Sequence, residues 1–171
     1  MRRFHALSRS APMMALVAVL AISGCASKKA LPNNPGDLGL SGAGANGAAP
    51  GTRQDFTVNV GDRIFFDTDS SVIRADAQDT LRRQAQWLNQ YGSYAITIEG
   101  HADERGTREY NLALGARRAA ATRDFLVAQG VSRGRIRTIS FGKEKPVAVC
   151  DDISCWSQNR RAVTVLGGAG S

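Results

Sequence analysis

One segment of 30 residues, Ala26–Asp55, limits where this chain of 171 residues can build a hydrophobic core. The segment contains no aromatic residue and is dominated by glycine, alanine, asparagine and proline, and six of the chain's eighteen glycines lie between Gly36 and Gly51. A stretch of this composition cannot bury enough apolar surface to offset its ordering entropy. We therefore interpret it as a flexible linker with an average span of roughly 30 Å, with the alternative that its last few residues belong to the domain that follows.

The residues before the linker predict an exported protein. Three arginines, the last of them Arg9, precede an apolar run of twelve residues, Ala11–Ile22, and no acidic residue occurs before Asp37. The run is too short to span a bilayer as a helix, and the pattern is typical of a signal peptide over residues 1–24. Its end, Ile22-Ser23-Gly24-Cys25, resembles the lipobox of bacterial lipoproteins, in which cleavage precedes the cysteine and the thiol carries diacylglycerol. An ordinary signal peptide that contains a cysteine is the alternative.

Lipidation of Cys25 would anchor the mature chain in a membrane. Each buried methylene contributes about 0.8 kcal/mol, so several acyl chains on one residue hold a protein almost irreversibly. The next residue is Ala26 rather than aspartate, which in similar lipoproteins favours the outer membrane. The sequence thus predicts an outer-membrane lipoprotein in which residues 25–54 are the lipidated cysteine and linker, and residues 55–171 are a head in the periplasm.

The charge of the chain does not indicate a nucleic-acid-binding protein. The formal net charge is +7, but the mature chain lacks three arginines and keeps 19 basic residues against 15 acidic ones, a balance of +4. The basic residues are scattered along the head, whereas a DNA-binding protein presents one basic face.

The head alternates between the periodicities of strands and helices. Strands are expected at 63–66, 94–100, 136–141 and 161–166, and helices at 75–91 and 108–129. Thr107 suits the N-cap of the second helix, and Gly130 suits its left-handed C-terminal residue. The order β-α-β-α-β-β, with only two long helices, predicts an α+β fold in which a mixed sheet and its helices form a two-layer sandwich.

Cys150 and Cys155 enclose a turn-like segment, Cys-Asp-Asp-Ile-Ser-Cys. In an oxidising periplasm they can form a disulfide, which stabilises so short a loop by roughly 2 kcal/mol. Two separate reduced thiols are the alternative.

No pattern in the chain predicts catalysis. Glu99, His101 and Asp103 alternate along a predicted strand, so that all three could face one side as a metal or acid–base site. However, neither GxSxG nor HExxH is present, and His101 is the single histidine of the mature chain. We therefore predict no catalytic residue, no metal and no cofactor.

Asp103 and Arg118 indicate binding instead. Asp103 stands where the second predicted strand gives way to the loop Glu104-Arg105-Gly106, and Arg118 lies about eleven residues into the following helix. A guanidinium on an otherwise apolar helix stripe needs a partner. An acid and an arginine that converge suit a zwitterionic ligand, because the acid binds its ammonium and the arginine binds its carboxylate. Spacing alone leaves open that the two side chains only pair with each other.

A long motif around these residues carries a family resemblance. The run Ile98-Glu99-Gly100-His101-Ala102-Asp103-Glu104-Arg105-Gly106-Thr107, followed by Tyr110-Asn111, Leu114-Gly115 and Arg117-Arg118-Ala119, closely resembles the signature of OmpA-like peptidoglycan-binding domains. The segments 64–67, 140–146 and 159–163 agree with it, so that the likeness covers roughly residues 55–166.

The resemblance implies non-covalent binding of the stem peptide of peptidoglycan, centred on meso-diaminopimelate. By motif position the ligand-binding acid falls on Asp103 and the carboxylate-binding arginine on Arg118. Further pocket positions fall on Phe66, Asp67, Arg105, Leu114 and Asn111. The resemblance also implies a competing periplasmic partner, TolB, and other proteins of the Tol system. The cysteines at 150 and 155 depart from the pattern, so the shape of their loop stays open.

Two functions of other classes remain as alternatives at this point. One is an envelope lipoprotein that acts mainly as a protein-binding module, and the other is a periplasmic enzyme of wall remodelling.

Overall fold

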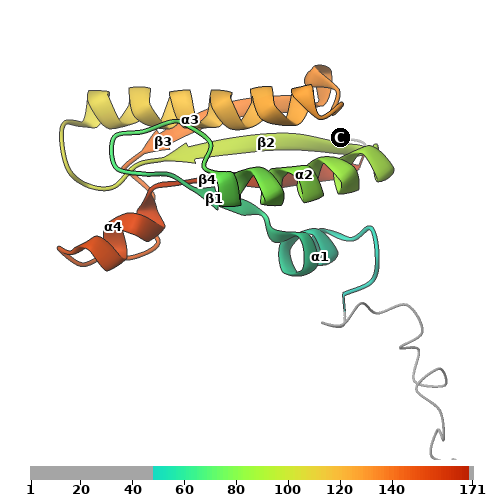
Figure 1. The fold of residues 1–171 in the computed structure, drawn as a ribbon, viewed down its shortest axis with the longest axis horizontal. Helices are drawn as coiled ribbons and strands as arrows, with labels where there is room; N and C mark the ends of the chain where they lie inside the picture. Colours follow the sequence, from blue (N-terminus) through green and yellow to red (C-terminus); the bar gives the residue numbers. More distant parts are fainter. Residues whose placement is uncertain (1–47, 170–171) are drawn as a thin grey trace, which may run out of the picture. The chain divides into compact units, whose positions relative to one another are not determined.

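A four-stranded mixed sheet organises the part of the chain that the computed structural model describes, residues 48–169 (Figure 1). Its strands are β1 (Arg63–Phe65), β2 (Tyr94–His101), β3 (Ile136–Gly142) and β4 (Arg161–Ala169), in the order β1-β4-β2-β3. β4 runs antiparallel to both β1 and β2, whereas β3 runs parallel to β2. The predicted signal peptide, Cys25 and most of the predicted linker lie outside the described residues.

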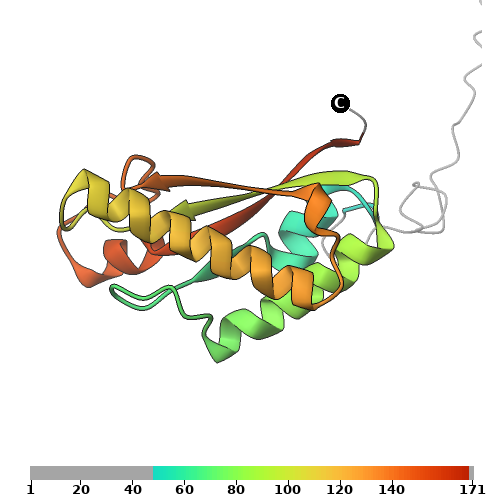
Figure 2. The ribbon, with the colours of Figure 1, turned by 90° about the horizontal axis from the view of Figure 1, so that it is seen from above.

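Two long helices cover the same side of this sheet, α2 (Ala75–Gln90) and α3 (Arg108–Ala128) (Figure 2). The hydroxyl of Thr107 accepts a hydrogen bond from the Tyr110 backbone N–H, which caps α3 as predicted. Gly130 follows α3 with a φ of +92°, a conformation that glycine adopts without steric cost. The predicted α+β fold, a mixed sheet with helices in two layers, is confirmed.

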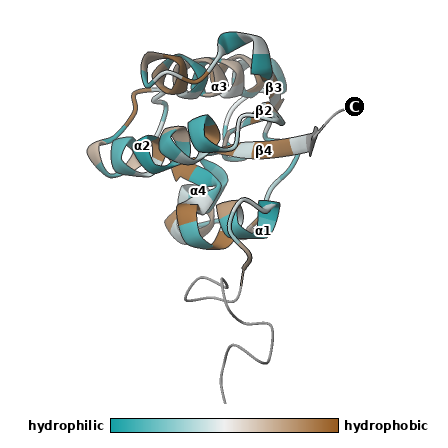
Figure 3. Cartoon of the chain, turned by 90° about the vertical axis from the view of Figure 1, so that its right-hand side faces the viewer, coloured by the Kyte–Doolittle hydropathy of each residue, from teal (hydrophilic) through white to brown (hydrophobic). Residues whose placement is uncertain are grey.

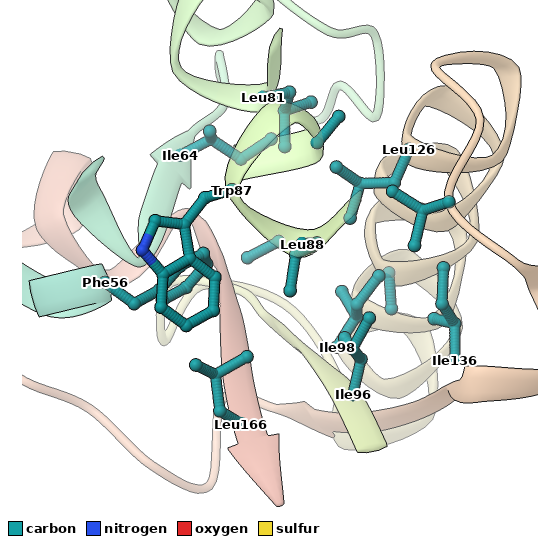
Figure 4. Close-up of a cluster of buried hydrophobic side chains, with 14 of the residues drawn as sticks. Phe56, Ile64, Leu81, Trp87, Leu88, Ile96, Ile98, Leu126, Ile136 and Leu166 are labelled. Atoms are coloured by element: carbon teal, nitrogen blue, oxygen red, sulfur yellow. The ribbon is translucent and has the colours of Figure 1, made fainter. Parts of the chain in front are cut away.

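The core lies between the sheet and these helices (Figure 4). Leu88 of α2, Leu126 of α3 and Ile98 of β2 are each fully buried. The remaining residues of α2 are mostly hydrophilic (Figure 3). Burial of a leucine or isoleucine side chain stabilises the fold by about 1.5–3 kcal/mol.

Several short helical segments were not predicted. The segment after Cys150 was interpreted as turn-like, but α4 (Ile153–Asn159) forms there, with the Asp152 side chain accepting from the Ser154 N–H. This corrects the predicted order, because a helix separates the last two strands. Seven residues are too few for a strong periodic signal, which explains why the helix was missed. A 3₁₀ turn, Arg133–Arg135, precedes β3.

The last residues of the predicted linker have a defined place. A short helix, α1 (Arg53–Asp55), is followed by a π-helical turn, Phe56–Gly61. The Asp55 carboxylate accepts from the indole N–H of Trp87 at 2.8 Å and from the backbone N–H of Gly51 at 2.9 Å. Residues from Gly51 onward therefore pack with the domain, although the sequence assigned residues up to 54 to the linker.

A close approach between Gly100 and Gly115 fixes α3 on β2. A Cβ atom at Gly100 would lie 1.9 Å from the carbonyl oxygen of Gly115. Only glycine permits this contact, and it brings the middle of α3 against the end of β2.

No helix within residues 48–169 is long and apolar enough to cross a membrane.

Candidate functional site

A cavity of about 210 Å³ lies beside the loop that follows β1, the end of β2 and the first turns of α3. Nine residues line it: Thr68, Asp69, Asp103, Arg105, Gly106, Tyr110, Asn111, Leu114 and Arg118. Five of the seven residues that the family motif marked are among them. The structure therefore brings together residues that lie up to fifty positions apart in the sequence.

Arg118 is a fully buried part of the cavity wall. Its guanidinium donates to three backbone carbonyls, from Nε to Ser70 at 2.8 Å, from Nη1 to His101 at 2.8 Å and from Nη2 to Asp67 at 3.0 Å. An arginine has five N–H donors, so two of them have no acceptor among residues 48–169. Burial lowers the pKa of Arg118 to about 10, and the side chain stays charged at neutral pH.

The Asp103 carboxylate also lines the cavity, and it forms hydrogen bonds with two arginines other than Arg118. Its carboxylate accepts from Arg105 Nη2 at 2.7 Å and from the buried Arg160 Nη1 at 3.3 Å. Burial alone would raise the pKa of Asp103, but the hydrogen bonds from Arg105 and Arg160 outweigh it and hold the pKa below its ordinary value. Asp103 is therefore ionised at neutral pH.

Phe66 and Asp67, which the family motif also marked, do not line the cavity. The ring of Phe66 is buried, with the Arg118 guanidinium carbon 5.2 Å from its centroid. The backbone carbonyl of Asp67 accepts a hydrogen bond from Arg118, whereas its carboxylate faces outward and pairs with Arg74 at 3.3 Å. Both residues contact Arg118, and neither is among the residues that line the cavity.

Tyr110 and Asp69 also line the cavity, and neither was predicted from the sequence as a site residue. The Tyr110 hydroxyl donates to the Asp69 carboxylate, and this contact raises the pKa of Tyr110. Asp69 has a φ of +55°, which is uncommon for a residue other than glycine. Tyr110 could have been found, because it precedes Leu114 and Arg118 at intervals of four on α3. Asp69 and Thr68 stand in a loop without periodicity and gave no signal.

Hydrogen bonds from two side chains, Asn111 and Lys143, hold the backbone of the loop 104–106 in place. Asn111 donates to the carbonyl of Arg105 at 2.8 Å. The Lys143 ammonium donates to the carbonyls of Glu104 at 3.1 Å and Gly106 at 2.7 Å. Asn111 therefore shapes the cavity through the backbone of this loop.

Glu99, His101 and Asp103 do not form one site. Glu99 and His101 do share a face, because His101 Nε2 lies 3.6 Å from a Glu99 carboxylate oxygen, but Asp103 lies apart from them. His101 is buried and stacks on Phe141 at 5.5 Å, while Asp103 lines the cavity. Burial, with the positive charges of Arg161 and Lys145, lowers the pKa of His101 to about 4. Within the described ranges no group of three metal-ligating side chains occurs.

Cys150 and Cys155 are joined by a disulfide, with Cα atoms 5.7 Å apart. The bridge links the start of the α4 segment to its middle and closes the loop that precedes the helix.

Comparison with known proteins places the chain in a family. Residues 65–160 match the model of the OmpA family. A peptidoglycan-associated lipoprotein of Mesorhizobium japonicum is 77% identical over 171 residues, which cover all of both chains. Another from Agrobacterium fabrum is 74% identical over 96% of this chain and 92% of the relative.

Solved structures agree with the fold. The crystal structure of the peptidoglycan-associated lipoprotein from Burkholderia pseudomallei matches with a TM-score of 0.61 and 44% identity, over 62% of this chain and 90% of that one. The C-terminal domain of Helicobacter pylori MotB matches with a TM-score of 0.59 over 64% of this chain and 86% of that one, at 22% identity, which shows the fold alone. The fold, the cavity and these matches define a member of the OmpA family. Within that family, the chain belongs to the peptidoglycan-associated lipoproteins.

Proposed function

We propose that this protein binds the diaminopimelate-containing stem peptide of peptidoglycan without forming a covalent bond. Anchored through Cys25, it would thereby tether the outer membrane to the cell wall. The observation that carries the proposal is the presence of an ionised Asp103 and a charged Arg118 on one cavity of about 210 Å³. The names of the relatives support peptidoglycan as the ligand.

The chemistry of diaminopimelate matches these two side chains. Its side chain ends in an ammonium and a carboxylate, so Asp103 accepts from the ammonium and Arg118 donates to the carboxylate. Charge-assisted hydrogen bonds of this kind are about twice as strong as neutral ones. The three backbone carbonyls that hold Arg118 keep its guanidinium in place before the ligand arrives, which lowers the entropic cost of binding.

The wider role rests on the family resemblance. Members of this group work with TolB and other proteins of the Tol system in envelope integrity and cell division. We propose the same partners here, with TolB competing for a surface that overlaps the cavity. The family is not one of enzymes, and the proposed activity is binding alone.

Co-sedimentation with purified sacculi tests the binding. The lipoprotein in detergent should sediment with sacculi that contain diaminopimelate and not with sacculi that carry lysine in its place. Asp103→Asn should reduce sedimentation at least tenfold. Asp79→Asn, an exposed acid paired with Arg82, is the matched control and should bind like the wild type. Absence of wild-type sedimentation would contradict the binding proposal, and release of soluble muropeptides would contradict the absence of catalysis.

The anchor needs its own test, because Cys25 lies outside the described residues. Cys25→Ser should leave the protein soluble or unprocessed. Normal retention of this variant in the outer-membrane fraction would contradict lipidation at Cys25.

A protein-binding module remains the second candidate, favoured by exposed apolar side chains around α4. Val147, Val149 and Ile153 are 54%, 89% and 62% exposed. If this surface serves TolB, Val149→Asp should weaken TolB binding and leave sedimentation with sacculi unchanged. If the surface has no such role, TolB binding should not change.

A further inference from the structure

Trp156 contacts the binding site from outside the cavity. It lies on α4, at the end of the domain where α3 begins (Figures 1 and 2). The guanidinium carbon of Arg105 stands 4.2 Å from the centroid of the indole ring, and the indole N–H donates to the Glu104 carboxylate. Trp156 itself does not line the cavity. It contacts Glu104 and Arg105, two residues of the loop 104–106 beside the cavity.

Arg105 is thereby held from two sides. One side is the face of Trp156, and the other is the Asp103 carboxylate, which accepts from Nη2 at 2.7 Å and from Nε at 3.3 Å. The Arg105 side chain is 41% exposed, and an ion pair at such a position fixes a long side chain only weakly. Stacking of the guanidinium on an aromatic ring supplies a second restraint.

The position of Arg105 matters because Asp103 has two cationic partners of different mobility. Arg160 is buried and also donates to the carbonyl of Phe66 at 3.2 Å, so that it is fixed. Arg105 is the partner that can change position. Its placement therefore determines how the Asp103 carboxylate is oriented and how much of it faces the cavity.

Contacts at both ends of α4 fix the helix, and with it Trp156, in position. The disulfide ends at Cys155, the residue before Trp156. At the other end of the helix, the buried Asn159 accepts from the N–H of Val147 at 2.9 Å and donates to the carbonyl of Ala148 at 2.8 Å. A helix of seven residues is not stable alone, so these restraints keep the indole where Arg105 meets it.

We propose that Trp156 is a positioning residue of the peptide-binding site, whose ring fixes Arg105 at the rim of the cavity and, through Arg105, orients the Asp103 carboxylate. This inference rests on the proposed function. It adds a residue that the family motif did not mark and gives the disulfide-linked helix a part in recognition.

Titration of the lipoprotein in detergent with a stem tripeptide that ends in meso-diaminopimelate tests the role. Trp156→Leu removes the aromatic face and should weaken binding about three- to fivefold. Trp156→Phe keeps a ring and loses the indole N–H, and it should restore most of the affinity. Ile153→Ala, an exposed position on the same helix, is the matched control and should bind like the wild type.

A double-mutant cycle separates positioning from a general loss of stability. Arg105→Ala should weaken binding by itself, and Trp156→Leu should then cause no further loss. An equal loss from Trp156→Leu in both backgrounds, or no loss in the wild-type background, would overturn the proposal. A wild type that does not bind the peptide contradicts the proposed function itself, and this inference with it.

Tryptophan fluorescence keeps the proposal testable if Trp156→Leu does not fold. The chain has two tryptophans, and Trp87 lies in the core. The tripeptide should change the emission of the wild type, and this change should be absent in Trp156→Phe. An emission that does not respond to a peptide that binds would overturn the positioning role.

Discussion

The Asp103 carboxylate does not pair with the Arg118 guanidinium, although both belong to the wall of one cavity. Asp103 accepts from Arg105 and Arg160, and Arg118 donates to three backbone carbonyls. The alternative that the two residues only neutralise each other is therefore wrong. Each charge is supported by other groups, which is the arrangement that a site for a zwitterion needs.

Replacement of Arg118 should affect both binding and stability. Arg118→Ala leaves three backbone carbonyls without their donor, of which that of His101 is buried, and a buried unsatisfied group costs about 1–3 kcal/mol. The hydrogen bonds of Arg118 therefore predict a loss of stability in addition to the loss of binding. Urea unfolding should show a loss of about 3 kcal/mol or more.

Arg118→Lys is the more informative variant. It keeps the charge, but an ammonium cannot reproduce the planar fork that reaches separate carbonyls and a ligand carboxylate. Peptide binding should fall at least tenfold, with a smaller loss of stability than in Arg118→Ala. Wild-type affinity in Arg118→Lys would show that the planar guanidinium is not required.

The sequence predicted the sheet and the long helices because their residues repeat with clear periods and end at Thr107 and Gly130. It predicted Asp103, Arg105, Leu114 and Arg118 because one continuous motif carries them. It did not predict that Arg160 pairs with Asp103, since the two residues lie 57 positions apart and only the antiparallel pairing of β4 with its neighbours brings them together. Nor could it separate the backbone role of Asp67 from a role of its side chain.

The contact between Tyr110 and Asp69 should control access to Arg118. The guanidinium is closed off from water, and the Tyr110 hydroxyl donates to the carboxylate of Asp69, which also lines this cavity. Tyr110→Phe removes that hydrogen bond and keeps the ring, so the stem peptide should associate faster. Stopped-flow binding measures the rate, and a rate equal to or below that of the wild type would contradict this role.

Gly100→Ala should disrupt the packing of α3 on β2. The new methyl group would lie 1.9 Å from the Gly115 carbonyl oxygen, and a backbone atom cannot move aside as a flexible side chain can. The free energy of unfolding should fall by about 3 kcal/mol or more, beyond the usual range for overpacking. Gly92→Ala is the control, because no atom lies within 4 Å of the added methyl group, and its stability should stay within about 0.5 kcal/mol of the wild type.

The burial of His101 should make stability depend on pH in a defined window. The pKa of His101 falls from its ordinary value of 6.5 to about 4 in the folded protein, and the only other histidine of the chain is His5. Between these two values the unfolded chain binds a proton that the folded protein does not bind. The free energy of unfolding should therefore decrease as the pH falls from about 6.5 to about 4, by at most about 3 kcal/mol.

Asp103 affects stability in a lower pH range than His101, because the pKa of Asp103 lies below its ordinary value of 3.8. Its stabilising effect is present at higher pH and is lost only as the pH falls below that value. Urea unfolding of the wild type and of His101→Phe at pH 7, 5.5 and 4.5 separates the two groups. Phenylalanine keeps a ring to stack on Phe141 but binds no proton, so the decrease between pH 6.5 and pH 4 should largely disappear. An equal decrease in both proteins would show that other groups cause it.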